Sequence, residues 1–294
     1  MPLTVFIGGL LEFNSGKTTF AKDMIEEFEQ NMSMKTVPFK PLSGNNLYYH
    51  YDKIKEHVEK YGNFVSLDIV ELMKSSSVDV PIVLANPVHR VNTQALPYHF
   101  YKEGSISTFF SKYSSSVSLF QRFTKHEKES EFSNAFIVNE PIFNNPKCWN
   151  DTSLSDPIIK QAKNLKYYKN EHEYYTMNSK FYADATESSF KYLQDKADVI
   201  VVESFNNSAH PAWCIRESDM VIIVGPGSFF VFEPDAYFRA IDNFRAIDRN
   251  KPSTTEDIIK FATPTEAFPL SIQQDKRKVE IQNLVKDLQK KFNK

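Results

Sequence analysis

The residues best suited to chemistry lie in one short stretch near the N-terminus. Residues 5–24 read VFIGGLLEFNSGKTTFAKDM and include Ser15-Gly16-Lys17-Thr18. In a phosphate-binding loop, backbone N–H groups and a helix N-terminus surround the phosphates, a lysine reaches the β- and γ-phosphate oxygens, and a hydroxyl binds Mg²⁺. The stretch ends in this way, but Leu11 stands where the usual G-x-x-x-x-G-K-[ST] pattern has its first glycine.

Two features favour a real phosphate loop over an accidental Gly-Lys-Thr. The chain has only 8 glycines, and three of them (Gly8, Gly9 and Gly16) lie in this stretch. A strand-like run precedes the loop and a helical pattern follows it, which is the context that the motif requires. Leu11 is tolerable if Gly8 and Gly9 relax the strand end and residue 11 avoids a positive φ. We therefore expect nucleotide binding by Asn14, Ser15, Gly16, Lys17, Thr18 and Thr19.

The apolar pattern along the chain predicts the elements that must position this loop. Strands are expected over residues 3–7, 34–39, 80–87, 197–203 and 219–224, and helices over 17–31, 52–74 and 272–294. The runs ADVIVVE and DMVIIV are nearly continuous in apolar residues, which is typical of parallel strands covered on both faces. Their alternation with helices predicts an α/β fold, with one doubly wound, mostly parallel sheet and helices on both faces.

The pattern is weaker between Pro97 and Glu187. This segment is rich in Ser, Tyr, Phe, Lys and Asn, and it contains one strand-like patch, NAFIVNEPIF. We expect a single domain over residues 1–294, in which residues 97–187 form a helical and looped insertion that serves as a wall or lid. No internal repeat is evident.

Composition excludes several classes of protein. The 294 residues are 41% hydrophobic and 24% charged, as in an ordinary globular protein. The formal net charge of −2 gives no reason to expect nucleic acid or a membrane surface as partner. Cys148 and Cys214 cannot form a disulfide framework or, by themselves, a zinc site, and no G-x-S-x-G hydrolase motif occurs. Without a signal peptide or a long apolar run, the expected compartment is the cytoplasm.

Four further blocks share their order and spacing with a known family. They are PFKPLSG with Lys40 and Ser43, SLDIVELMKSSS with Asp68, ANPVHR at residues 85–90, and IVVESFNNSAHP with Glu203. Together with the loop, these blocks resemble the dethiobiotin synthetase family and, more broadly, the deviant P-loop NTPases that group with it. The resemblance implies a P-loop NTPase fold.

The resemblance also implies roles for the matching residues. Lys17 would bind the β- and γ-phosphates, and Lys40 would neutralise charge on the transferring phosphoryl group. Mg²⁺ would be bound by Thr18, by Glu203 at the end of a buried strand, and by Asp68. Catalysis would rest on Lys17, Lys40 and Glu203. Structural alternatives stay open: a surface lysine at position 40, a helix N-cap or solvated residue at position 68, and a carboxylate that caps a sheet edge at position 203.

The acceptor is expected beyond the γ-phosphate, in the crevice outside the carboxyl ends of the strands. The acceptor-binding residues would be Ser43, Asn86, His89 and Arg90, which would line one continuous cleft with Lys40, Glu203 and Asn206. The basic character of this set favours an anionic small molecule, and a carboxylate is preferred.

These expectations describe a Mg²⁺-dependent NTPase or phosphotransferase that uses ATP, or else GTP, in a ligase- or kinase-like reaction. Dethiobiotin synthesis itself is not expected, because the family's glycines after Glu203 are replaced and its base-reading motif is not visible between Gly225 and Leu270. One alternative is a nucleotide-dependent switch ATPase or GTPase that acts on a protein partner. Another is a scaffold that binds no nucleotide. The choice between a monomer and a homodimer stays open.

Overall fold

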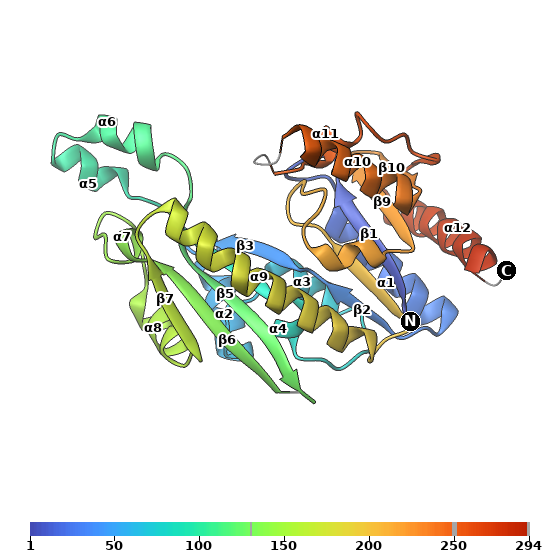
Figure 1. The fold of residues 1–294 in the computed structure, drawn as a ribbon, viewed down its shortest axis with the longest axis horizontal. Helices are drawn as coiled ribbons and strands as arrows, with labels where there is room; N and C mark the ends of the chain where they lie inside the picture. Colours follow the sequence, from blue (N-terminus) through green and yellow to red (C-terminus); the bar gives the residue numbers. More distant parts are fainter. Residues whose placement is uncertain (130, 249–251, 293–294) are drawn as a thin grey trace. The chain divides into compact units, whose positions relative to one another are not determined.

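The computed structural model describes residues 1–129, 131–248 and 252–292, with side chains up to residue 286. The chain forms two compact units, each built from several segments (Figure 1). The first unit comprises Met1–Pro41, Asp68–Val80 and Phe190–Lys294. The second comprises Leu42–Leu67 and Pro81–Ser189. The predicted insertion, residues 97–187, lies within the second unit, and Ser130 of that segment is outside the described residues.

The first unit is built on a six-stranded sheet. Its strands are β1 (Leu3–Gly9), β2 (Thr36–Phe39), β8 (Val199–Glu203), β9 (Met220–Gly225), β10 (Ser228–Phe232) and β11 (Glu266–Pro269), in the order β11-β10-β9-β1-β8-β2. β9, β1, β8 and β2 are parallel, whereas β10 and β11 are antiparallel to their neighbours. Every residue of β2, β8 and β9 is buried, which explains their nearly continuous apolar runs.

Helices flank this sheet. They are α1 (Lys17–Met32), α3 (Leu67–Met73), the 3₁₀ segment η2 (Trp213–Glu217), α10 (Pro234–Ile247), α11 (Thr255–Ile258) and α12 (Gln274–Phe292). The buried Phe20 of α1 packs against Phe229 of β10, and Tyr237 of α10 packs against Phe6 of β1. α12 is held to α1 by Arg277, whose Nε lies 2.6 Å from the carboxylate of Asp23.

The second unit has a mixed five-stranded sheet in the order β3-β4-β5-β6-β7. The strands are β3 (Leu42–Asn46), β4 (Val88–Thr93), β5 (Val117–Lys128), β6 (Glu131–Asn139) and β7 (Asn164–Tyr168). The pairs β3–β4 and β6–β7 are parallel, and β4–β5 and β5–β6 are antiparallel. The helical segments are α2 (Tyr51–Tyr61), α4 (Ile82–Ala85), α5 (Pro97–Lys102), α6 (Ile106–Thr108), the π-helical segment η1 (Phe109–Tyr113), α7 (Glu140–Phe143), α8 (Thr152–Lys160) and α9 (Glu171–Gln194), whose last residues belong to the first unit.

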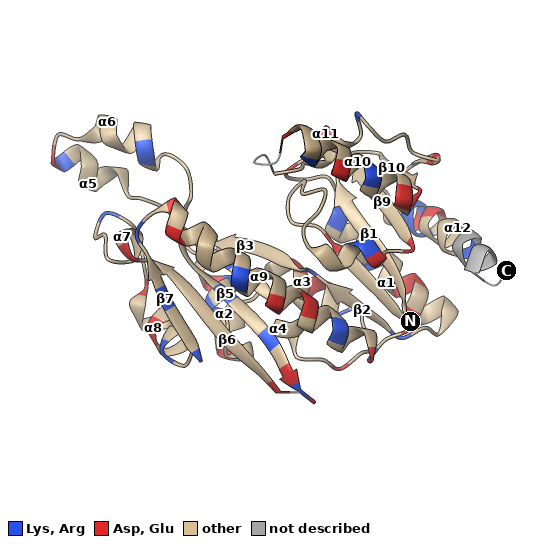
Figure 2. Cartoon of the chain, viewed as in Figure 1, with Lys and Arg blue, Asp and Glu red and all other residues tan. Residues whose placement is uncertain are grey.

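Two apolar clusters cover the second sheet. One joins Phe120 and Phe136 to Ile54 of α2 and Ile158 of α8. The other joins strand residues such as Phe123 to Met177 and Phe181 of α9. Lys and Arg residues are interspersed with Asp and Glu residues along the helices of both units, in keeping with the small net charge (Figure 2). No helix among the described residues is both long and apolar enough to cross a membrane.

The expected strands at 3–7, 34–39, 197–203 and 219–224 are confirmed, as is the helix from residue 17. The C-terminal helix is confirmed as α12, and residues 293 and 294 lie outside the described residues. The predicted helix over 52–74 divides into α2 and α3, because the chain turns at Gly62 with a φ of 64°.

Two predictions are wrong. Residues 80–87 form no strand: Ile82–Ala85 is a short helix that follows Pro81, and periodicity cannot distinguish a buried helical turn from a buried strand in so short an apolar run. The single predicted sheet is instead two sheets, because β3 to β7 pair among themselves. The α/β class stands, with a mixed sheet in each unit.

Candidate functional site

A loop over residues 10–16 joins β1 to α1 in the first unit. β1 lies between two parallel neighbours, and the backbone N–H of Leu10 donates to the carbonyl of Val224 at 2.8 Å, which anchors the start of the loop. Asn14 and Gly16 adopt left-handed backbone angles, with φ of 56° and 86°. Glycine meets no steric penalty there and asparagine meets less than most residues. Leu11 is not among the described residues with a positive φ, which meets the condition under which leucine can replace the usual glycine at this position.

Gly9 has a steric role that the sequence did not reveal. A Cβ atom at this position would lie 2.6 Å from Lys17 Nζ and 2.8 Å from Ser15 Oγ, closer than atoms can approach. The side chain of Lys17 therefore folds back over Gly9, where it is only 8% exposed and lies 3.1 Å from Ser15 Oγ. We expected Gly9 to relax the end of the strand. In the structure, its missing side chain leaves the space that the Lys17 side chain occupies.

The N-terminus of α1 begins directly after this loop. Gly16 makes no side-chain cap, no acidic residue lies in the first turn, and the first helical hydrogen bond runs from the N–H of Phe20 to the carbonyl of Gly16. The N–H groups of Lys17, Thr18 and Thr19 precede that bond and have no acceptor within the helix. Such donors, together with the helix dipole, attract anions.

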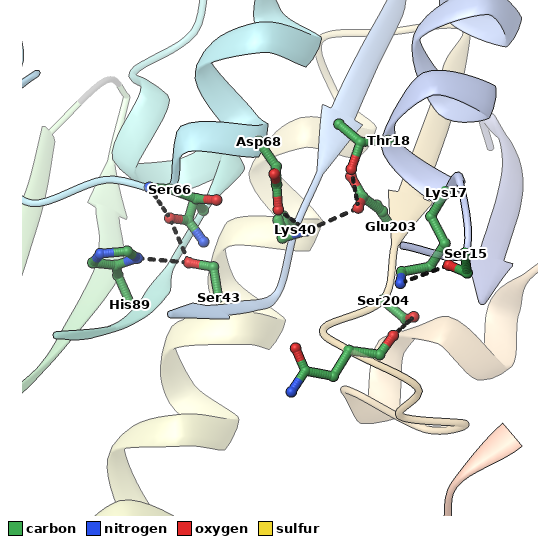
Figure 3. Close-up of polar contacts among 12 residues, drawn as sticks. Ser15, Lys17, Thr18, Lys40, Ser43, Ser66, Asp68, His89, Glu203 and Ser204 are labelled. Atoms are coloured by element: carbon green, nitrogen blue, oxygen red, sulfur yellow. Dashed lines mark hydrogen bonds and ion pairs between the residues drawn. The ribbon is translucent and has the colours of Figure 1, made fainter. Parts of the chain in front are cut away.

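Strand pairing brings the other charged residues to the same end of the sheet. β2 and β8 are parallel, with Phe39 opposite Val202, so that Lys40 and Glu203 emerge next to each other. Lys40 Nζ lies 2.9 Å from Glu203 Oε1 and 2.8 Å from Asp68 Oδ2. Thr18 Oγ1 donates to the same Oε1 atom at 2.8 Å. Figure 3 shows this chain of contacts, with Lys40 between Asp68 and Glu203 and Thr18 on the other side of Glu203.

These contacts and exposures bear on the structural alternatives for Lys40, Glu203 and Asp68. Lys40 is 3% exposed and is therefore no surface lysine, and Glu203 is 1% exposed at the end of an interior strand. Asp68 is the second residue of α3 and its side chain is 47% exposed, so it is an ion-pair partner of Lys40 rather than the helix cap.

The electrostatics of the cluster follow from burial and pairing. Burial opposes the charged form of Lys40, but the carboxylates of Glu203 and Asp68 outweigh it and raise the pKa of Lys40. For Asp68, desolvation is likewise outweighed, and Lys40 lowers the pKa of its carboxyl group. Burial lowers the pKa of Lys17, with Lys40 adding to the effect and Glu203 opposing it. Two lysines and two carboxylates thus balance in charge.

The predicted Mg²⁺ ligands fit the ion in part. Among the described residues, no three His, Cys, Asp or Glu side chains are grouped as a metal site. Mg²⁺, however, is often held by one or two protein oxygens and several waters. Glu203 Oε2 is buried and has no hydrogen-bond partner in the described part of the chain, and Thr18 supplies a second hard oxygen beside it. The pair of Thr18 and Glu203 therefore suits Mg²⁺, whereas Asp68 is linked to Glu203 through Lys40.

Three of the predicted acceptor residues form a buried network in the second unit. Ser43 Oγ lies 2.7 Å from His89 Nδ1 and donates to Asn86 Oδ1 at 3.0 Å. The backbone N–H of Ser66 donates to the same amide oxygen at 3.1 Å. All four side chains are at most 2% exposed. The network thus connects β3, β4 and the segment before α3.

Arg90, the fourth acceptor candidate, lies on β4 next to His89 but takes part in different contacts. Its Nη2 donates to the hydroxyl of Tyr174 on α9 at 2.7 Å, and its Nε donates to Gln121 on β5 at 3.2 Å. The predicted placement of His89 and Arg90 just beyond a strand that ends at Pro87 is wrong, because both lie inside β4, and residues 82–85 are helical. Asn206 donates to Glu12 of the loop at 3.2 Å.

Sequence reasoning missed one buried cation. Arg122 on β5 is 0% exposed, and it donates to the carbonyl oxygens of Phe64 and Asn86 at 3.0 and 2.8 Å. Burial lowers its pKa to about 9. A single arginine in a strand with mixed polar residues carries no local signal of such burial, so only the fold could reveal it.

The chain was also compared with known proteins. The chain shows no significant similarity to any protein-family model, any curated protein or any solved structure.

Proposed function

We propose that the first unit binds a nucleoside triphosphate with Mg²⁺ and transfers its γ-phosphoryl group. One observation carries the proposal: the Thr18 hydroxyl donates to a fully buried carboxylate, Glu203, whose other oxygen has no partner among the described residues. This pair lies at the first turn of the uncapped helix α1. Oxygen ligands for Mg²⁺ therefore lie next to backbone N–H groups that can bind phosphate. This combination suits a polyphosphate with a bound metal ion.

Each residue of the cluster has a role in this proposal. The N–H groups at the start of α1 hold phosphate oxygens, and the ammonium of Lys17 replaces its contact with Ser15 by contacts to the β- and γ-phosphates. Thr18 and Glu203 hold Mg²⁺, which neutralises phosphate charge when bound. Lys40 stabilises the charge that develops on the transferring group.

The reaction is an in-line displacement at phosphorus. An oxygen of the acceptor forms a bond to the γ-phosphorus as the bond to the β–γ bridging oxygen breaks, and the nucleoside diphosphate leaves with that electron pair. The acceptor gives up its proton, when it has one, to solvent. The nucleotide is ATP, or else GTP, and the reaction is ligase- or kinase-like with an anionic small molecule as acceptor.

Arg90, in the second unit, is a separate observation in favour of an anionic acceptor. Its partners, Gln121 and Tyr174, are neutral, and no carboxylate pairs with it in the described part of the chain. A half-buried guanidinium of this kind suits a carboxylate or phosphate. Acceptor binding by Ser43, Asn86 and His89 remains part of the proposal on the resemblance alone.

A second candidate function is a switch ATPase or GTPase that acts on a protein partner. The observation that favours it is the apolar tip of the loop: Leu11 is 44% exposed and Phe13 is 65% exposed. Large exposed apolar side chains beside a nucleotide site suit contact with another protein. Slow basal hydrolysis that a protein accelerates would favour the switch, and fast turnover that needs a small molecule would favour the enzyme.

The test of nucleotide binding is Lys17→Ala. Removal of a charge-assisted contact to phosphate should weaken ATP–Mg²⁺ binding by about 2–3 kcal/mol in calorimetry, with the fold retained in circular dichroism. Lys22→Ala is the matched control, because Lys22 lies on the same helix with its side chain 43% exposed. Equal ATP affinity in the wild type and in a folded Lys17→Ala protein would overturn the phosphate-loop assignment.

A further inference from the structure

Lys40 occupies the position of a counter-ion for Glu203. The carboxylate of Glu203 is 1% exposed, and Lys40, 3% exposed, is the cation that contacts it in the described structure. A buried carboxylate without a cation is strongly unfavourable, so Lys40 offsets the cost of burying this side chain. The same oxygen, Oε1, also accepts the hydrogen bond from Thr18.

A metal ion on Thr18 and Glu203 would lie close to this ammonium. Mg²⁺ bonds to oxygen at about 2.1 Å, so an ion on the unpartnered Oε2 of Glu203 would lie within about 7 Å of Lys40 Nζ, which is 2.9 Å from Oε1 of the same carboxylate. A divalent and a monovalent cation at that distance repel each other strongly in a buried site. The metal ion and the Lys40 ammonium would also share the negative charge of one carboxylate, that of Glu203.

Asp68 provides a second partner to which Lys40 can remain bound. Its carboxylate lies 2.8 Å from Nζ, and its side chain is about half exposed, so it can follow a moving ammonium. Phosphate oxygens on the loop would add a further attraction for Lys40. The surroundings of Lys40 therefore let it leave Glu203 without becoming an unpaired buried charge.

We propose that Lys40 is a built-in competitor of the divalent cation: it holds Glu203 until nucleotide phosphates draw it away, so that metal binds tightly only together with nucleotide. The inference rests on the proposed function, since it assigns regulation to the same metal site. Its consequence is a positive, reciprocal coupling between metal and nucleotide affinity.

The test uses Mn²⁺ as the probe, without nucleotide, on the full chain. Lys40→Met keeps an apolar stem and removes the charge, and we expect it to bind Mn²⁺ at least tenfold more tightly than the wild type in calorimetry or electron paramagnetic resonance. The double variant Lys40→Met/Glu203→Gln should lose this gain. Lys22→Met is the exposed control and should match the wild type. Mn²⁺ affinity in folded Lys40→Met that equals or falls below that of the wild type would overturn the inference.

A second measurement avoids the risk that Lys40→Met does not fold. In the wild type, the side-chain ammonium resonances of Lys17 and Lys40, the lysines that are buried among the described residues, can be followed by ¹⁵N NMR, with Lys17→Ala assigning the first and so leaving the second. Saturating Mg²⁺ together with ATP should change the Lys40 resonance, as its bond to Glu203 breaks. An unchanged Lys40 resonance under conditions where ATP–Mg²⁺ is bound would also overturn the inference.

Failure of the inference and failure of the proposed function give different results. A gain in Mn²⁺ affinity in Lys40→Met, with no ATP binding by the wild type, would uphold the competition and reject nucleotide binding. ATP binding that depends on Lys17, with unchanged Mn²⁺ affinity in Lys40→Met, would uphold the function and reject the competition.

Discussion

Each unit has a buried cation at the centre of a polar network, Lys40 in the first and Arg122 in the second, and the two cations are satisfied in opposite ways. Lys40 in the first unit contacts two carboxylates, which raise its pKa. Arg122 in the second unit contacts neutral oxygens, namely the backbone carbonyls of Phe64, Asn86 and Pro87 and the hydroxyl of Thr124, and burial lowers its pKa to about 9. No carboxylate pairs with Arg122 within the described ranges.

The difference indicates different uses of charge. Backbone carbonyls cannot move without moving the chain, so Arg122 is a fixed tie between β5 and the segments around Phe64 and Asn86. Carboxylate side chains can turn toward another cation, so the partners of Lys40 are exchangeable. A cation paired with side-chain carboxylates suits the proposed ligand site, and a cation held by backbone carbonyls suits a scaffold.

The largest expected effect on stability comes from removing the hydrogen bonds between Arg122 and the backbone carbonyls. Arg122→Met leaves several buried carbonyl oxygens without donors, and we expect it to lower the free energy of unfolding by about 3–5 kcal/mol in chemical denaturation. The exposed neighbour Lys125 gives the control variant Lys125→Ala, which should remain within about 0.5 kcal/mol of the wild type. A folded Arg122→Met protein of wild-type stability would remove the contrast between the two cations.

Smaller effects are expected from alanine substitutions at Gly9, which faces flexible side chains, and at Gly8, which faces the packed core. In Gly9→Ala the new methyl group meets the flexible Lys17 and Ser15 side chains, which can shift, so stability should fall by less than about 1 kcal/mol. Because Lys17 is displaced, ATP affinity should fall about tenfold, or about 1.4 kcal/mol.

Gly8→Ala is the matched variant one residue earlier. There the methyl group would lie 2.6 Å from Ile223 Cδ1 inside the core, so stability should fall by about 1–3 kcal/mol. Denaturation and calorimetry on both variants check the pair. The reverse pattern, with Gly9→Ala the less stable protein and ATP affinity lower only in Gly8→Ala, would contradict the position assigned to Lys17.

The smallest expected effect is the pH dependence of the half-exposed ion pair. The pKa of Asp68 is lowered in the folded protein, so its stabilising contribution is present above the ordinary carboxyl pKa of 3.8 and is lost as pH falls through the lower folded value. Asp68→Asn should therefore cost about 0.5–1 kcal/mol at neutral pH and nothing at strongly acidic pH, as measured by denaturation across this range.

The exposed Asp79 supplies the control for that series through Asp79→Asn, a surface substitution that should remain within about 0.5 kcal/mol of the wild type. If Asp68→Asn lowers stability by the same amount at every pH, the carboxylate does not contribute through its charge, and its pairing with Lys40 is of no energetic consequence.

Local patterns predicted the elements that depend on neighbouring residues. The apolar runs of β1, β8 and β9 and the Gly-Lys-Thr at the start of α1 identify a strand, a loop and a helix without any knowledge of distant residues. The same approach failed for residues 82–85, because an apolar run of this length fits either a helical turn or a strand. It also missed β5 and β7, because residues 97–187 were expected to be helical or looped outside the patch NAFIVNEPIF.

The place of Gly16, Lys17 and Thr18, where a loop leads into a helix, could be predicted from the sequence, because the geometry that joins them is set within a few residues of one chain segment. The tertiary structure alone decided that the strands form two sheets, that Lys40 lies between Asp68 and Glu203, and that Gly9 makes room for Lys17. These facts depend on strand register and on side chains up to 163 residues apart. Pairing at such separations is selected by the packing of the whole unit, and no local pattern of residues contains it.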